Sequence, residues 1–282
     1  MVREVQGSIR TVLKEALSKG EFSWPAETSL LSAGSMLSRE ETDLLRLTRK
    51  GILADEALTG YSILQSFLSY FIYSNLQGLY DMMFDECGNV AMTLETVSAE
   101  TTLAELLNLI TKVRFGHVLV RLDGTKHHIG IYDLIELYSK ERIRTDLSCF
   151  EVGSNIIYLK GDTTLPELLF EMMSKKVRRF FIENTKSFVS DRTIIAYLFS
   201  SATVSLLRKE PEKLMKVTVR ETGVIDALPV GPSMKVSEAA TLLLKRRRDC
   251  LVYDERVITP WDCVIKPFLM KRLDIQSGDK DL

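Results

Sequence analysis

The sequence predicts an α/β protein made of four diverged copies of one β-α-β-β-α unit, each roughly 60 to 70 residues long. Two observations lead to this prediction. A short strand, a turn, a second short strand and a helix start recur four times along the 282 residues. Ahead of each recurrence lies an apolar segment with helical spacing that opens at a small or hydroxyl cluster. The repeat therefore organises most of the chain.

The second half of each copy carries the clearest signal, because strand, turn, strand and helix start follow one another in the same order. These halves span 43–64, 117–135, 179–195 and 249–264. In the first copy the turn is expected at 48–51. The helices that follow are expected to begin at Thr59, Gly130, Ser190 and Thr259.

The first half of each copy is predicted to be a helix, and these helices begin within 28–37, 101–110, 163–173 and 233–244. Thr102 with Glu105 and Thr164 with Glu167 have the spacing of a capping box. Strands are expected ahead of two of these helices, at 155–159 and 223–228.

The remaining segments are assigned by periodicity. Residues 1–20 place apolar side chains at helical spacing and predict an amphipathic helix, which packs on its own domain or on a partner. Residues 63–72 predict a helix that buries one broad face. The apolar stretch 67–84 is short and interrupted by polar residues, so we do not expect it to cross a membrane. Residues 274–282 are a tail.

Composition excludes several classes of protein. A net charge of −1 gives no general attraction to nucleic acid, which is not an expected partner. Four cysteines without a CxxC pair, and a charged N-terminus, fit ordinary core thiols and a cytoplasmic location. His117, His127 and His128 lack metal-ligand spacing. No phosphate loop or nucleophile elbow occurs, so we assign no catalytic residue, metal or cofactor and expect no enzyme.

The recurring pattern resembles the cystathionine-β-synthase (CBS) repeat, whose second helix opens with a T-x-x-D motif. Thr259-Pro-Trp-Asp262 reproduces this motif, and the second copy keeps Asp133 after Gly130. The first and third copies carry Ser62 and Thr193 where the acid is expected. The resemblance implies four CBS repeats in two CBS pairs, 21–140 (repeats 21–84 and 88–140) and 150–273 (repeats 150–205 and 217–273). This arrangement is similar to the regulatory γ subunit of AMP-activated protein kinase and its archaeal relatives.

The family implies clefts between paired repeats that hold adenine nucleotides. Carried over to this sequence, Asp262 and Asp133 would hold a ribose, and Thr259 would contact phosphate. Basic positions before the second strand are Arg114, Arg178, Arg179, Arg247 and Arg248. The base would contact Val224, Ile225 and Ala227 in copy four. A carboxylate accepts two hydrogen bonds from a ribose diol, and the guanidinium fork matches phosphate oxygens.

Other interpretations of the same residues stay open. Thr259 to Asp262 can be a helix start alone, with Thr as N-cap and Asp in the first turn. Residues 245–248 can be a solvated helix C-terminus. At the level of function, a regulatory protein that senses AMP, ADP or ATP is expected. The alternatives are a scaffold of degenerate repeats without ligand, and an enzyme with an undetected site. A homodimer or a regulated protein partner is compatible with either of the first two.

Overall fold

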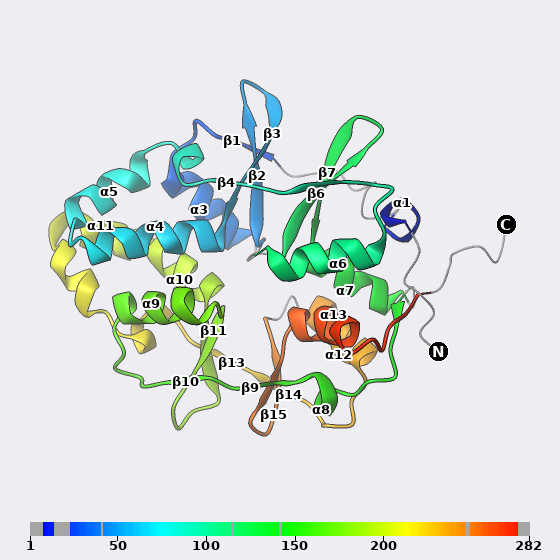
Figure 1. The fold of residues 1–282 in the computed structure, drawn as a ribbon. Coiled ribbons are helices and arrows are strands. Elements are labelled where there is room, and N and C mark those ends of the chain that lie inside the picture. Colours follow the sequence, from blue (N-terminus) through cyan, green and yellow to red (C-terminus); the bar gives the residue numbers. More distant parts are fainter. Residues whose placement is uncertain are drawn as a thin grey trace. The chain divides into compact units, whose positions relative to one another are not determined.

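The computed structural model describes residues 8–13, 23–40, 42–113, 116–140, 143–245 and 249–275. It confirms the predicted α/β fold of repeats (Figure 1). The chain divides into two compact units. Unit 1 takes Met1–Glu21, Leu94–Ile156 and Ala227–Leu282, and unit 2 takes Phe22–Thr93 and Ile157–Asp226. Compactness therefore groups copies two and four in unit 1 and copies one and three in unit 2. The sequence-order pairs 21–140 and 150–273 stay a prediction.

Copy one supplies the first sheet of unit 2, in the order β1-β2-β3-β4. The strands are β1 (Ser23–Pro25), β2 (Leu44–Arg49), β3 (Ile52–Thr59) and β4 (Met92–Thr93). β1 is parallel to β2, and the other neighbours are antiparallel. The helical elements are α3 (Leu30–Arg39), α4 (Gly60–Ile72), α5 (Leu76–Phe84) and the 3-10 turn η1 (Cys87–Asn89). The predicted turn at 48–51 is shorter than expected, because Thr48 and Arg49 belong to β2.

Copy three repeats this plan in unit 2, with a sheet in the order β10-β11-β12-β13. Its strands are β10 (Tyr158–Leu159), β11 (Arg179–Ile182), β12 (Ser187–Ser190) and β13 (Ile225–Asp226). Its helical elements are α9 (Leu165–Lys175), α10 (Asp191–Leu198), α11 (Ser201–Lys209), η2 (Pro211–Lys216) and η3 (Val219–Thr222). Helices of copies one and three share one apolar core, which includes Phe67, Phe180 and Phe199.

Unit 1 holds copies two and four. Copy two contributes β5 (Thr96–Ser98), α6 (Leu103–Lys112), β6 (His117–Leu122), β7 (Thr125–Gly130) and α7 (Ile131–Ser139). Copy four contributes β14 (Leu228–Pro229), α12 (Val236–Lys245), β15 (Leu251–Tyr253), β16 (Arg256–Ile258) and α13 (Pro260–Leu269). The smaller elements are α1 (Ile9–Val12), β8 (Ile143–Arg144), α8 (Cys149–Val152), β9 (Ser154–Asn155) and β17 (Asp274–Ile275). The sheets run β5-β6-β7, β14-β15-β16-β9 and β17-β8.

The two strands predicted at 155–159 and 223–228 are each divided between two sheets. β9 pairs with β16 of copy four, whereas β10, two residues later, pairs with β11 of copy three. In the same way β13 joins β12 and β14 joins β15. The single-strand prediction was wrong because the chain passes from one compact unit to the other at these points. Copies three and four are thereby linked by an exchange of strands.

The N-terminal prediction is tested only over residues 8–13, and the rest of 1–20 lies outside the described residues. α1 places Ile9 and Leu13 in the core of unit 1. Ser8 forms an isolated antiparallel bridge with Thr102, the residue that caps α6. These residues therefore pack on their own unit. At the other end, residues 274 and 275 belong to β17 rather than to a tail.

The predicted broad face of the helix at 63–72 belongs to the core. Ile63, Leu64, Phe67 and Phe71 are buried in unit 2, whereas Ile72 at the end of α4 is 62% exposed. Within the part of the chain that the structure describes, no helix is long and apolar enough to cross a membrane.

The cysteines are ordinary core thiols. Cys87, Cys149, Cys250 and Cys263 are all buried, and none of the four forms a disulfide. Burial raises the pKa of both Cys87 and Cys149 to about 11. Buried thiols with raised pKa values are poor nucleophiles, which fits a structural role.

The predicted capping boxes are confirmed. Thr102 N and Oγ1 donate to Glu105 Oε2 at 2.9 and 2.8 Å, and Thr164 makes the same pair of bonds to Glu167 at 2.8 Å each. The hydrogen bonds from the backbone and hydroxyl of the N-cap threonine lower the pKa of both carboxyl groups. In each box the bond from the threonine nitrogen satisfies a backbone N–H that the helix itself leaves open.

We expect these two glutamates to contribute to acid unfolding. Their pKa values are lower in the folded chain than in the unfolded chain, so their stabilisation is complete above the unfolded pKa and is lost as pH falls through the folded pKa. Glu105→Gln with Glu167→Gln keeps an oxygen acceptor at each cap but removes the titration. The fall of the urea midpoint between about pH 5 and 3 should therefore be shallower in the double variant. Equal slopes would contradict the assignment.

Candidate functional site

The best-matched motif of the sequence starts helix α13. Thr259 is the N-cap, and its Oγ1 accepts a hydrogen bond from Asp262 N at 3.3 Å. Pro260 occupies the first helical position, where its missing N–H costs nothing. Asp262 is the carboxylate of a capping box, since Thr259 N and Oγ1 donate to its Oδ2 at 2.9 and 2.7 Å. The local sequence therefore dictates where this carboxylate lies.

The other oxygen of Asp262 is also occupied. Ser154 Oγ, from β9, donates to Oδ1 at 2.6 Å, and Lys266 Nζ lies 3.1 Å from the same atom. A carboxylate offers about four acceptor positions, and four donors fill them here. Only 2% of Asp262 is exposed. A ribose can bind this group only by replacing one of its present partners.

Lys266 is the cation that balances this buried carboxylate. It follows Asp262 by one helical turn, and its Nζ also donates to Val152 O at 2.6 Å and to Ser154 Oγ at 2.8 Å. An ammonium group has three donors, and these contacts use all three. The cluster of Ser154, Thr259, Asp262 and Lys266 is thus satisfied internally. Ser154 is the member that a ligand hydroxyl could replace at the lowest cost, because it is neutral.

The equivalent helix start in copy two is built differently. Gly130 N donates to Asp133 Oδ2 at 2.9 Å, and Asp133 is half-buried. Gly130 pairs with His117 across β6 and β7. A Cβ at position 130 would lie 2.9 Å from His117 Nδ1, so the imidazole occupies the space of the motif's hydroxyl side chain. His117 Nδ1 lies 3.0 Å from His128 Nε2. The substitution of Gly for Thr therefore has a packing reason.

The helix starts of copies one and three keep capping boxes without a carboxylate. Ser62 N donates to Thr59 Oγ1 and Thr59 N donates to Ser62 Oγ, both at 3.1 Å. Ser190 N donates to Thr193 Oγ1 at 3.0 Å. A hydroxyl replaces the acid in each box, so these two copies lack the group that would accept both bonds of a ribose diol.

Arg178, predicted to contact phosphate, lies in a buried ion network of unit 2. Its Nε donates to Asp191 Oδ2 at 2.6 Å, and its Nη2 lies 3.3 Å from Asp43 Oδ1. Arg192 binds the same Asp43 oxygen through Nε at 2.9 Å and Nη2 at 2.8 Å. Copy one thus meets copy three through two carboxylates and two guanidinium groups. All four contacts are charge-assisted. Both carboxylates are buried, whereas the side chains of Arg178 and Arg192 are 36% and 19% exposed.

The other predicted ligand residues belong to both units or lie outside the described residues. Arg179 lies in β11, half-buried and opposite Ser190. Val224 and Ile225 are exposed in unit 2, whereas Ala227 is buried in unit 1. Arg114, Arg247 and Arg248 lie outside the described residues. Within unit 1 the structure brings Asp262 and Thr259 together, and the ligand roles of all the predicted residues stay predictions.

Sequence reasoning missed Ser154 and Lys266 in copy four and the acids Asp43 and Asp191 in unit 2. The contact of Lys266 with Asp262 could have been predicted, because Lys266 follows Asp262 by four residues on one helix. Ser154 and Asp43 meet partners more than 100 residues away and gave no local signal. Among the described residues no group of three or more His, Cys, Asp or Glu side chains could hold a metal ion.

Comparison with known proteins supports the fold. The chain has the fold of a protein with four CBS repeats. It is similar to the crystal structure of a Methanocaldococcus jannaschii protein described as a proposed archaeal homologue of g-AMPK, with 15% identity and a TM-score of 0.76. That likeness covers 92% of this chain and 99% of the other. An uncharacterised conserved protein from Pyrococcus horikoshii matches at 13% identity and a TM-score of 0.50, over 93% of this chain and 100% of that one.

The sequence comparisons give no match. No family model matches this sequence, and no curated protein matches it. The repeat architecture is therefore recognisable from structure at an identity too low for function to be carried over with it.

Proposed function

We propose that this protein is a regulatory module that binds an adenine nucleotide, with the helix start of α13 in copy four as the principal site. The observation that carries this proposal is the Thr259–Asp262 capping box at the start of α13, and the fold shared with a proposed g-AMPK homologue supports it. Asp262 and Thr259 stand at the helix start where the CBS pattern places its ribose and phosphate contacts. A ribose hydroxyl would take the place of Ser154 Oγ on Asp262 Oδ1. No residue is assigned to bond chemistry.

Copy two is the second site in this proposal. Asp133 is less buried than Asp262, and His117 stands beside its N-cap in place of a hydroxyl. Copies one and three, whose boxes end in Ser62 and Thr193, are not expected to hold a ribose. Their contribution would be the rigid framework of unit 2.

A scaffold without ligand is the second candidate, and the closed cluster favours it. All acceptor positions of Asp262 are filled, and Arg178 is engaged by Asp43 and Asp191. In a scaffold of this kind, the motif residues would stabilise the fold and would bind no ligand.

A thermal-shift panel of AMP, ADP, ATP and S-adenosylmethionine separates the two candidates. A ligand that binds only the folded chain raises the melting temperature. At a ligand concentration of 100 times the dissociation constant, the free energy of unfolding increases by about 2.7 kcal/mol. We expect a saturable rise with at least one nucleotide. No shift with any of the four would contradict nucleotide sensing.

Asp262→Ala should remove that rise. Glu167→Ala is the matched control, because it deletes the capping carboxylate of α9 without touching copy four. Both variants should melt at lower temperature. Only Asp262→Ala should lose the response to nucleotide, and an unchanged response would assign Asp262 to capping alone.

A further inference from the structure

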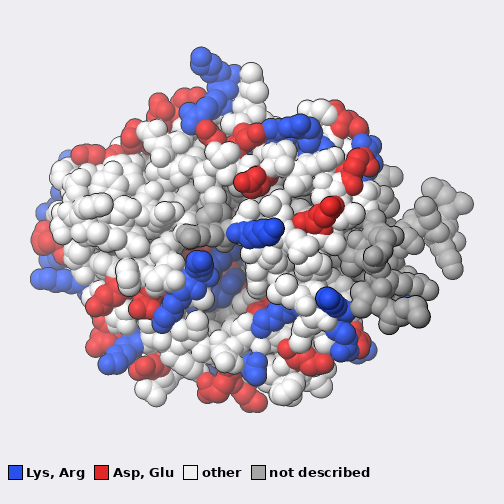
Figure 2. Space-filling view, viewed as in Figure 1, with Lys and Arg blue, Asp and Glu red and all other residues white. Residues whose placement is uncertain are grey.

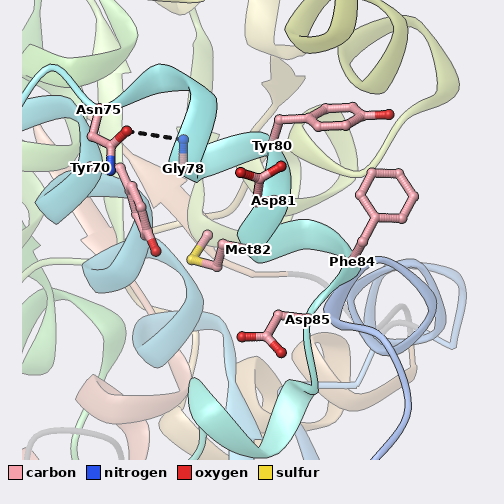
Figure 3. A pocket seen from close by; sticks show the side chains of 8 residues that line it. All are labelled: Tyr70, Asn75, Gly78, Tyr80, Asp81, Met82, Phe84 and Asp85. Carbon is pink, nitrogen blue, oxygen red and sulfur yellow. Dashed lines mark hydrogen bonds between the residues drawn. The ribbon is translucent and has the colours of Figure 1, made fainter.

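An outward-facing pocket in unit 2, separate from every helix start described above, is lined by residues of α4 and α5 and has a volume of about 570 Å³. Figure 3 shows the ring of Tyr70 on one side and the rings of Tyr80 and Phe84 on the other, with the carboxylates of Asp81 and Asp85 between them. The rings of Tyr80 and Phe84 contact each other with centroids 4.9 Å apart and planes tilted by 52°. The lining thus combines aromatic faces with two acids.

Local geometry fixes this shape. Ser74 turns the chain with φ +53°, and Asn75 caps α5 by accepting a hydrogen bond from Gly78 N at 3.0 Å. A Cβ at Gly78 would lie 2.8 Å from the Tyr70 ring, so only glycine lets that ring approach α5. Leu79 and Met83 anchor the inner face of α5 in the core. The pocket is therefore built on a packed helix.

Exposed apolar side chains occur in the pocket lining and in the chain segment next to it. Phe84, which lines the pocket, is 49% exposed. Ile72 and Tyr73, between the lining residues Tyr70 and Asn75 in the chain, are 62% and 81% exposed. The surface over α4 and α5 is mostly white in Figure 2. Exposed apolar groups gathered in this way mark interaction sites more often than isolated ones do.

The lining of the pocket carries charge of one sign. Asp81 and Asp85 are its two acidic residues. The elements α11 and η2, which contact α5, carry basic residues such as Arg208 and Lys213 outside the lining. None of the eight residues that line the pocket is basic. A guanidinium or ammonium group placed there would meet two carboxylates and the faces of aromatic rings, both of which attract cations.

We propose that this pocket binds a basic and apolar segment of a partner protein, with an arginine or lysine side chain between Asp81 and Asp85 and an apolar side chain against Phe84. Arginine and aromatic side chains dominate the binding energy of such contacts. The inference stands apart from nucleotide binding, since it uses no residue of the helix starts. It supplies the surface through which a regulatory module would contact its target.

Selection from a random dodecapeptide library on the full-length protein tests this proposal. We expect enrichment of sequences that place Arg or Lys next to Leu, Phe or Ile. By fluorescence anisotropy, an enriched peptide should bind about tenfold more weakly to the Asp81→Asn, Asp85→Asn double variant. Phe84→Ala should weaken binding to a similar degree. The charge-matched control, Asp162→Asn with Glu183→Gln, removes two exposed acids of unit 2 that do not line the pocket and should bind within about twofold of wild type.

The outcomes separate clearly. Peptides without an excess of basic residues, no enrichment at all, or equal affinity for the Asp81/Asp85 double variant would each overturn the proposal. Spermine is the competitor that tests for a free polyamine as the ligand. Displacement of the peptide by micromolar spermine would assign the pocket to a small cation instead of a protein segment. Circular dichroism melts of the variants establish that each is folded at the assay temperature.

Discussion

Asp43→Ala is expected to lower the free energy of unfolding by about 3 kcal/mol. The substitution leaves Arg192, whose side chain is only 19% exposed, and Arg178 without the carboxylate they share. Arg178 keeps its contact with Asp191, so the main loss is the Arg192–Asp43 pair. Breaking a largely buried ion pair costs far more than losing a surface pair. Urea unfolding of the full chain, followed by tryptophan fluorescence and circular dichroism, gives this difference directly.

The surface pair of Arg49 and Glu56 is the control for that measurement. Its atoms lie 2.7 Å apart, but the side chains are 46% and 32% exposed. Glu56→Ala should therefore cost no more than about 1 kcal/mol. The double variant Asp43→Ala with Arg192→Ala should recover part of the loss, because both partners are removed together. Equal costs for Asp43→Ala and Glu56→Ala would show that the network does not stabilise unit 2.

Lys266→Met should be nearly as damaging, at about 2 to 3 kcal/mol. Methionine fills a similar volume but leaves the Asp262 side chain, 3% exposed, without its cation. It also removes the hydrogen bond that Val152 O accepts from Lys266 Nζ at 2.6 Å. Chemical denaturation at pH 7 reports the loss.

Lys175→Met serves as the matched comparison, because Lys175 forms an i,i+4 ion pair with Glu171 at 2.8 Å and its own side chain is 47% exposed. Helical pairs of this kind contribute roughly 0.3 to 0.5 kcal/mol. A loss in Lys266→Met that does not exceed the loss in Lys175→Met would contradict a buried, paired Asp262.

Features set by neighbours in the chain could be predicted from sequence. The boxes of Thr102 with Glu105 and of Thr259 with Asp262 depend on residues three apart, and the structure forms both. The turn between β6 and β7 also depends on neighbouring residues. Asp-Gly is a favoured pair for a two-residue hairpin turn, and Asp123 and Gly124 both adopt the positive φ that such a turn requires. Local chemistry therefore fixes the repeat and its helix starts.

Features set by distant partners could not be predicted. The strands around Ile156 and Ala227 are two residues long, and which sheet each joins depends on strands far along the chain. Arg178 looked like a phosphate ligand because it precedes a strand in the repeat. Its contact with Asp43 spans 135 positions of sequence, so nothing local to Arg178 indicated that a carboxylate would engage it.

Isothermal titration of the full-length protein with AMP tests the central claim most directly, alongside the same titration of Asp262→Ala. The proposal predicts saturable binding with at least one site per chain. It also predicts a loss of affinity of about tenfold or more in the variant, since a carboxylate accepting ribose hydroxyls contributes charge-assisted hydrogen bonds. Absence of binding to the wild type, or equal affinity in both proteins, would contradict nucleotide recognition at the α13 helix start.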